Sequence, residues 1–447
     1  MIRSLKVKIF GLLVKNIPYF YALFLLIVYK KVSFIDKNRK TILMLTPERF
    51  RGDVSVLVRT NEFNIIIIEQ KWLQLTFSIF YNQDKLKGDY NFYTAKSGDI
   101  VQNRSVFRKT LKREVLLFSR MVAVDAIVSA ASYYKWEHDI GYIFEKYVCP
   151  WIVFHRENLY ASPGFYKFGL GLYGSKGNFY GSHIITHNET TKDIMLSCGY
   201  TSTGQVSALG ALRMDEFVSK IKLQDQTIYG NQTKKKNILL ISFTPGSSLY
   251  GYKGDPKNLK VSDVLWPAKD DGMWNLFNHV HRDLMTFCKN NNCNLTIRPK
   301  WGDRWLDEIA QMSNDEDAEK TTNVDLISDM HELMFRADVI VGFASTAVLE
   351  AGLTNKPVIL PYFDEAKYEK YSQYILLKDT FDAFEVADSR IDLTNMLKQY
   401  TRSPFILSND KKNKREKCFE KWVSKTDMCT TSRYIDLINN VIDSYHD

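Results

Sequence analysis

The sequence predicts an α/β protein with two doubly wound, Rossmann-like domains whose parallel sheets face each other across a cleft. Three observations predict it. Short runs rich in Val, Ile and Leu alternate with helical stretches, this alternation restarts after a polar break at 231–236, and 447 residues exceed one ordinary core. We expect a basic, apolar leader at 1–40, a first domain at 41–231, a second at 232–400 and C-terminal helices at 401–447.

The first 40 residues hold nine Lys or Arg and one acid, and so carry nearly all of the net charge of +9. Between these charges lies the apolar and aromatic run Ile17–Tyr29. It is too short to cross a bilayer, which takes about 20 residues, and no signal-peptide cleavage site follows it. A cation-flanked apolar helix predicts binding to the membrane interface. The alternative is a terminal helix packed on the protein's own core.

Buried strands and one long helix are expected in the first domain. The expected strands are Thr41–Leu45, Asn64–Glu69, Ala126–Ala130, Trp151–His155 and His183–His187. A helix is expected over Ser105–Met121. The Gly- and aromatic-rich stretch Ser162–Gly181 does not match a dinucleotide-binding glycine pattern, and we interpret it as a flexible loop that suits a sugar acceptor. A plain mobile surface loop is the alternative.

The second domain repeats the alternation. Strands are expected at Ile238–Phe243, Asn294–Arg298, Val324–Ile327, Val339–Val341 and Val358–Leu360, and helices at Trp274–Asn290, Trp305–Met312 and Met330–Phe335. No repeat of solenoid period occurs. The order of strands and helices is that of a parallel doubly wound sheet.

The most informative stretch of the second domain is Ala337–Ala366, which predicts strand, turn, short helix and strand. Ser345 is a good N-cap for a helix over Thr346–Thr354. The free N–H groups at such a helix start can bind a phosphate, and Glu350, about one turn further on, can accept hydrogen bonds from a ribose. An ordinary strand–helix–strand crossover that binds nothing is the alternative.

Polar residues follow the other predicted strands of this domain. Arg298 and Lys300 come directly after a strand, with Pro299 stiffening the turn between them. Ser242 lies at the end of another strand. Ligands of doubly wound sheets bind at the carboxyl ends of the strands, so these residues are candidates for binding the phosphates of a nucleotide. Two solvated loop cations are the alternative.

The corresponding strand end of the first domain carries His155, Arg156 and Glu157. An imidazole or carboxylate at this place could act as general base on an acceptor hydroxyl. A hydrogen-bonded pair that fixes the next loop explains the same residues. Arg213 and Asp215 close the first domain, and we expect them to fix the interdomain turn.

Composition excludes some classes of site and partner. Six scattered cysteines lack a CxxC spacing, so we expect reduced thiols and no zinc site. Asp270 and Asp271 have no further acidic ligands nearby in the sequence, so no metal is expected. The excess positive charge flanks an apolar run and forms no basic stripe on a domain, which disfavours nucleic-acid binding.

Together these segments resemble the GT-B glycosyltransferase superfamily, above all bacterial surface-polysaccharide transferases of the Kdo and CDP-glycerol transferase groups and the related UDP-GlcNAc 2-epimerases. The resemblance rests on the strand ending in His155 and Glu157, on Ser182–Tyr200, on the GALRMDEF turn, on IRPK and on Ala337–Ala366. It implies that Ser345 and Thr346 meet phosphate, that Glu350 meets the ribose, and that Arg298 or Lys300 binds phosphate.

The resemblance implies a glycosyltransferase at the cytoplasmic face of a bacterial membrane. Its substrates would be a nucleotide sugar and a lipid-linked or growing capsule or O-antigen glycan, without a metal or other cofactor. Where glycerophosphotransferases carry His-Pro, this chain has Arg298-Pro299-Lys300, which argues against that reaction. A nucleotide-sugar epimerase and a catalytically degenerate binding protein are the alternatives.

Overall fold

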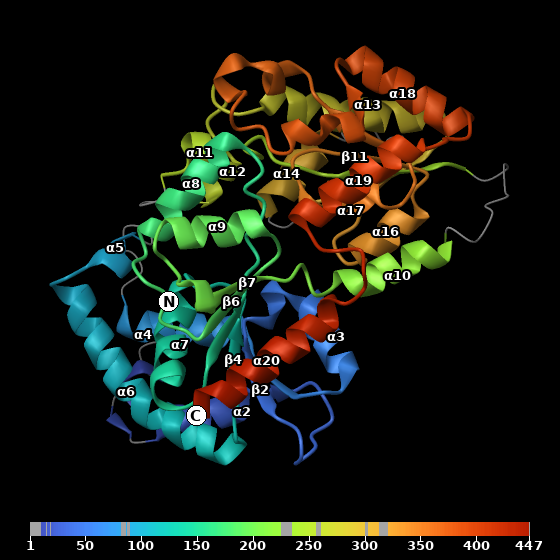
Figure 1. Cartoon of the computed structure of the whole chain (residues 1–447). Coiled ribbons are helices and arrows are strands. Elements are labelled where there is room, and N and C mark those ends of the chain that lie inside the picture. The colour runs from blue at the N-terminus through green and yellow to red at the C-terminus, as the bar shows by residue number, and fades with distance from the viewer. Residues whose placement is uncertain are drawn as a thin grey trace.

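The computed structural model describes residues 10–14, 16, 17, 19–81, 86, 90–224, 235–255, 261–299, 303–312 and 321–446. Over these residues the chain forms two α/β lobes, each built on one sheet (Figure 1). The two lobes confirm the predicted fold class. The polar break at 231–236 falls mostly outside the described residues.

The first lobe contains a seven-stranded sheet in the order β1-β3-β2-β4-β5-β6-β7. Its strands are β1 (Lys30–Lys31), β2 (Thr41–Leu45), β3 (Asn64–Ile68), β4 (Ala126–Ser129), β5 (Trp151–Phe154), β6 (His183–Thr186) and β7 (Val206–Ala208). All neighbours pair in parallel except β1, which pairs antiparallel with β3. The order of strands reverses at β2 and β4, where doubly wound sheets bind ligands.

The second lobe contains a six-stranded, wholly parallel sheet in the order β10-β9-β8-β11-β12-β13. Its strands are β8 (Asn237–Ile241), β9 (Asn294–Arg298), β10 (Thr322–Val324), β11 (Val339–Gly342), β12 (Val358–Pro361) and β13 (Glu385–Ala387). The order reverses at β8 and β11. The segment after β11, where the sequence predicts a phosphate site, therefore begins at the switch point.

Helices cover both faces of each sheet. In the first lobe they are α2 (Phe20–Val28), η1 (Pro47–Arg49), α3 (Arg51–Thr60), α4 (Gln70–Phe80), α5 (Tyr90–Thr94), α6 (Asp99–Val122), α7 (Lys135–Tyr147), α8 (Pro163–Gly174), α9 (Glu189–Ser197), η3 (Thr203–Gln205) and α10 (Met214–Gln224). In the rest of the chain they are α11 (Tyr250–Lys253), α12 (Val261–Leu265), α13 (Trp274–Asn290), α14 (Asp303–Met312), α16 (Met330–Arg336), α17 (Thr346–Gly352), η4 (Asp364–Lys367), η5 (Glu369–Tyr371), η6 (Lys378–Ala383), α18 (Arg390–Arg402), α19 (Asn409–Trp422) and α20 (Thr430–His446).

Most predicted strands occur where the sequence places them, because buried parallel strands are continuous apolar runs. One differs. The strand predicted at Val324–Ile327 is β10 at Thr322–Val324. Asp325 ends it, since its carboxylate accepts the backbone N–H groups of Ile327 and Ser328 at 2.9 and 2.8 Å and turns the chain.

The stretch predicted as a flexible loop at Ser162–Gly181 is instead largely a helix. Pro163–Gly174 forms α8, with Pro163 in its first turn and the Ser162 hydroxyl accepting from the Phe165 N–H. The prediction was wrong because the Ser162 cap and Pro163 start a helix in which the glycines are tolerated. Gly169 is packed so closely against Tyr160 that a Cβ there would lie 2.8 Å from the tyrosine ring, which explains a glycine inside a helix.

The N-terminal segment is partly built into the first lobe. One face of α2 buries Tyr21, Ala22, Leu25 and Val28 in the core. The Glu114 carboxylate on α6 accepts the backbone N–H groups of Tyr19 and Ala22 at 3.1 and 3.2 Å. The other face is open, with Leu23 54% and Ile27 81% exposed. No helix among the described residues is long and apolar enough to cross a membrane.

The last two helices tie the lobes together. Helix α19 packs on α17 and η6 of the second lobe. Helix α20 then runs back over the first lobe (Figure 1), where Ile438 and Ile442 join the cluster that contains Ile42 and Phe154. The chain therefore crosses between the lobes twice.

Candidate functional site

The carboxyl edges of the two sheets meet at one junction. Helix α8, which follows β5, packs on α11, which follows β8. The backbones come so close that a Cβ on Gly251 would lie 2.5 Å from the carbonyl oxygen of Gly164. Both glycines are therefore required by the close approach of the lobes.

At this junction α17 begins as the sequence predicts. The Ser345 hydroxyl accepts the N–H of Ala347 at 3.2 Å and caps the helix. Thr346, the first helical residue, is half-buried. Ser345 serves its own helix in this way, and phosphate binding by Ser345 and Thr346 stays a prediction.

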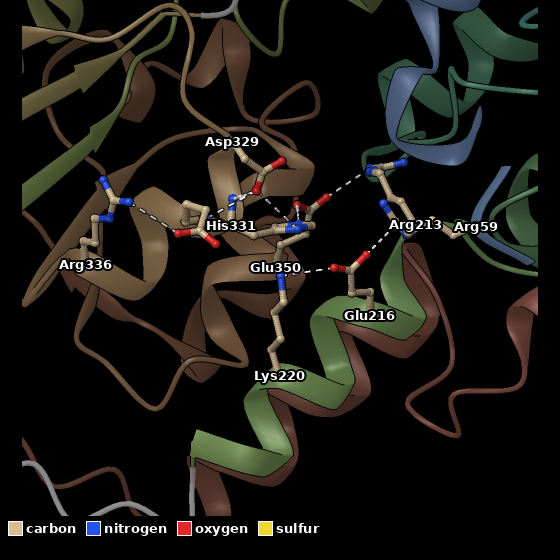
Figure 2. A network of polar contacts seen from close by, with 9 residues as sticks. Arg59, Arg213, Glu216, Lys220, Asp329, His331, Arg336 and Glu350 are labelled. Atoms are coloured by element: carbon tan, nitrogen blue, oxygen red, sulfur yellow. Dashed lines mark hydrogen bonds and ion pairs between the residues drawn. The ribbon is translucent and has the colours of Figure 1, made fainter. Parts of the chain in front are cut away.

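Glu350 on α17 is the centre of a polar network between the lobes (Figure 2). Arg213, from the turn after β7, donates from Nη2 to Glu350 Oε1 at 3.2 Å. His331 of α16 places Nε2 2.9 Å from Oε2. Glu350 is only 4% exposed. Its buried carboxylate is therefore held by Arg213 of the first lobe and His331 of the second.

The partners of Glu350 keep it ionised. Burial alone would raise the pKa of Glu350, but the hydrogen bond from His331 and the charge of Arg213 lower it to about 2. Burial alone would lower the pKa of Arg213, but the charges of Glu350 and Asp53 raise it above its usual value. The Asp53 carboxylate also accepts the Arg213 backbone N–H at 3.0 Å.

The rest of the network in Figure 2 is shallower. Glu216 pairs with Arg59 of the first lobe and, at 3.2 Å, with Lys220 of its own helix. Beside this network, Phe217 stacks on the His331 ring, with centroids 4.0 Å apart and an interplanar angle of 22°. Since Phe217 lies on α10, the helix that follows Arg213, it fixes this turn against the second lobe, as the sequence predicts for Arg213.

The other predicted donor-binding residues are differently engaged. Arg298 donates from Nη1 to the carbonyl oxygen of Asp325 at 2.7 Å, so it fixes the loop after β10. Ser242 is buried, and its hydroxyl lies 2.8 Å from His281 Nε2 and accepts from Trp305 Nε1 at 2.8 Å. The predicted direct role of Ser242 therefore has no free hydroxyl to support it. Lys300 lies outside the described residues.

The two predicted catalytic residues differ in access. His155 is fully buried, with Nε2 2.7 Å from the Tyr173 hydroxyl and 3.1 Å from the Glu157 carbonyl oxygen. Burial lowers the pKa of His155 to about 4, so the imidazole is neutral at pH 7. The Glu157 side chain is exposed. Burial raises the pKa of Tyr250 of the second lobe, and the negative charge of Glu157 raises it further. Of the two, Glu157 can touch an acceptor.

A cavity of about 730 Å³ lies elsewhere, on the second lobe. Its lining includes Asp283 of α13, Asp364 of η4 and Arg390 of α18. None of the predicted site residues lines it, and Arg390 and Asp283 are paired with each other at 2.6 Å. Within the described ranges no three His, Cys, Asp or Glu side chains come together as metal ligands would.

Comparison with known proteins decides the fold. No family model and no curated protein sequence matches the chain. Its structure is similar to that of the wall teichoic acid polymerase TagF, with a TM-score of 0.50 and 12% identity over 91% of this chain and 90% of that chain. The fold is GT-B.

Other similar structures are a glycosyltransferase from Rickettsia africae and a UDP-GlcNAc 2-epimerase from Neisseria meningitidis bound to UDP-GlcNAc. The first has a TM-score of 0.45 and 11% identity over 91% of this chain and 99% of that one. The second has a TM-score of 0.46 and 12% identity over 90% and 99%.

The GT-B junction brings together residues that the sequence analysis left without a role. Asp53 holds Arg213, and His331 holds Glu350. No local sequence pattern points to Asp53 or His331, and only the structure shows that they belong to the site. Arg156 and His187 carry a signal in the sequence, because Arg156 directly follows the predicted strand Trp151–His155 and His187 ends the predicted strand His183–His187.

Proposed function

We propose that the protein is a glycosyltransferase that moves a sugar from a nucleotide-sugar donor to a lipid-linked or growing surface-polysaccharide acceptor, such as a capsule or O-antigen chain. One observation carries the proposal: Glu350, buried and ionised at the switch point of the second sheet, is joined to Arg213 of the first lobe. The donor's ribose would bind at Glu350. Each carboxylate oxygen keeps a second lone pair for a ribose hydroxyl.

The chemistry follows from the residues at the junction. Glu157, exposed after β5, would take the proton of the attacking hydroxyl while the sugar leaves the diphosphate. The neutral, buried His155 would position the Glu157 backbone through its contact with the Glu157 carbonyl oxygen. The N-terminus of α17 and Lys300 would stabilise the departing phosphate. No metal is required for these steps.

Nucleotide binding is expected to depend on Glu350 and Lys300. In calorimetric titrations with UDP, GDP, CMP and CDP, one nucleotide should bind to the wild-type protein. Lys300→Ala and Glu350→Gln should each weaken that binding about tenfold or more, since each removes a charge-assisted hydrogen bond. Glu332→Gln, a change in an exposed acid of α16 that pairs with Arg336, is the matched control. Unchanged binding in both variants would overturn the donor site.

The open face of α2 supports binding at the inner face of the cell membrane. Leu23 and Ile27 are exposed, as is Leu12 before the helix, which is 62% exposed, and exposed apolar groups flanked by cations favour anionic bilayers. We expect Leu23→Ser/Ile27→Ser to reduce sedimentation with anionic phospholipid vesicles severalfold, whereas Ile406→Ser, at a residue 87% exposed outside α2, leaves it unchanged. If the Leu23→Ser/Ile27→Ser variant sedimented with the vesicles as well as the Ile406→Ser variant does, membrane binding through this face would be contradicted.

The structure also changes what removal of the leader is expected to do. Truncating residues 1–35, most of the leader expected at 1–40, would strip Tyr21 and Leu25 from the core and β1 from the sheet edge. Such a truncation would confound membrane release with unfolding. Substitutions on the exposed face of α2 avoid this.

A further inference from the structure

Two basic side chains at the junction, an arginine and a histidine, lie without a polar partner among the described residues. Arg156 follows β5 and His187 follows β6, so both lie at the carboxyl edge of the first sheet, and both are half-buried. Within the described part of the chain, neither side chain makes a hydrogen bond or ion pair. A third basic side chain, that of Arg213, has one guanidinium nitrogen, Nη1, buried without a hydrogen-bond partner.

The backbone around these residues is firmly built. Asn158, 3% exposed, donates from Nδ2 to the His155 carbonyl oxygen at 2.6 Å and accepts the His187 N–H at 3.0 Å. Asn188, equally buried, donates to the Asn158 carbonyl oxygen at 2.9 Å. The ends of β5 and β6 are thereby clamped together, which holds Arg156 and His187 in fixed places.

The electrostatics of this place are unfavourable as they stand. Burial lowers the pKa of His187 well below its usual value, and Arg213 and Arg156 lower it further. Burial and the repulsion of Arg213 also lower the pKa of Arg156, although the negative charges of Asp53 and Glu157 partly offset this. Asp53 is already paired with Arg213. Arg156 is thus a partly desolvated cation to which neither carboxylate is bonded, and an anionic ligand would offset the cost of its burial.

We propose that Arg156, His187 and Arg213 form a phosphate-binding subsite of the first lobe. Arginine is suited to it because its fork of N–H groups matches phosphate oxygens. The phosphate would belong either to the acceptor or to the donor's diphosphate. Only this choice of source rests on the proposed function, because the subsite itself follows from the side chains.

Calorimetric titration with inorganic pyrophosphate tests the subsite. Arg156→Ala is expected to raise the Kd about tenfold to hundredfold and His187→Ala about threefold to tenfold, as loss of one charged or one weaker hydrogen bond predicts. Arg156→Lys, which keeps the charge, should recover part of the loss. Arg120→Ala is the control, since Arg120 is exposed in the last turn of α6, the helix that leads to the amino end of β4. Thermal unfolding confirms that each variant is folded.

The outcomes are distinct. If the tightest of the four nucleotides loses affinity by the same factor, the subsite holds the donor's phosphate; if its affinity is unchanged, the subsite holds the acceptor's. Wild-type affinity for pyrophosphate in Arg156→Ala and His187→Ala, or no binding by the wild type, would overturn the subsite. Pyrophosphate binding that depends on Arg156, in a protein that binds no nucleotide, would instead overturn the proposed function and keep the subsite.

Discussion

Replacing Arg213 with methionine is expected to lower the free energy of unfolding by about 3 kcal/mol. The substitution removes the charge that compensates Glu350, whose side chain is only 6% exposed, and leaves a buried carboxylate with His331 as its remaining partner in Figure 2. Breaking one side of a buried pair costs roughly 3–5 kcal/mol, and partial exposure of Arg213 reduces this. Chemical denaturation measures the loss, and the melting temperature should fall by roughly 3 °C in a chain of this length.

Two further variants separate the pair from nonspecific effects. Arg59→Met breaks the neighbouring but exposed pair with Glu216 and should cost less than about 1 kcal/mol. In Arg213→Met/Glu350→Met both charges are gone, so much of the loss should be recovered. Equal destabilisation by Arg59→Met and Arg213→Met would show that the interdomain pair has no special role.

The same carboxylate gives the stability a dependence on acid pH. The pKa of Glu350 in the folded protein, about 2, lies below its usual value of 4.5. The stabilisation is therefore complete above about pH 4.5 and is lost as the pH falls towards 2. We expect the free energy of unfolding, measured by denaturation between pH 4.5 and 2, to fall less steeply with decreasing pH for Glu350→Gln than for the wild type.

Glu157→Gln is expected to lower the rate of sugar transfer by roughly a hundredfold to ten-thousandfold, the contribution typical of a general base. Glu157 is exposed at the carboxyl end of β5, close to Tyr134 and to Tyr250 of the second lobe. The amide keeps the shape and removes the basicity. Nucleotide affinity should stay within about twofold, because the ribose site lies on Glu350.

The matched control for this variant is Glu189→Gln, at an exposed acid in the first turn of α9 that pairs with Lys192 at 2.9 Å. It should transfer sugar at the wild-type rate. Full activity in Glu157→Gln would remove Glu157 from the mechanism. Loss of nucleotide binding in the same variant would assign Glu157 to donor binding instead.

Much of the fold could be predicted from the sequence because its strands are buried on both faces. Runs such as Asn64–Ile68 and Val339–Gly342 read as continuous apolar segments wherever they lie. Helix α8 was missed because its glycines satisfy close packing against Tyr160 and Tyr374, which is a tertiary demand. The packing of α2 on α6 was equally hidden, since an apolar helix suits a membrane and a core alike.

The candidate site was predicted less completely. Ser345 and Glu350 could be placed because a cap and a helix position depend on neighbouring residues. The partner of Glu350, Arg213, is 137 residues away, and no local pattern joins the two. Ser242 and Arg298 are at strand ends as expected, but the groups they contact, the Trp305 indole and the Asp325 carbonyl, belong to later segments.

The most direct test of glycosyl transfer is to incubate the full-length protein with its nucleotide sugar, labelled in the sugar, with and without bacterial membranes. We predict label in the lipid or polysaccharide fraction, with release of the nucleotide, only when membranes are present. A nucleotide sugar that isomerises without membranes would show an epimerase. A nucleotide sugar that stays intact with membranes would show a binding protein, and either result would contradict the proposed function.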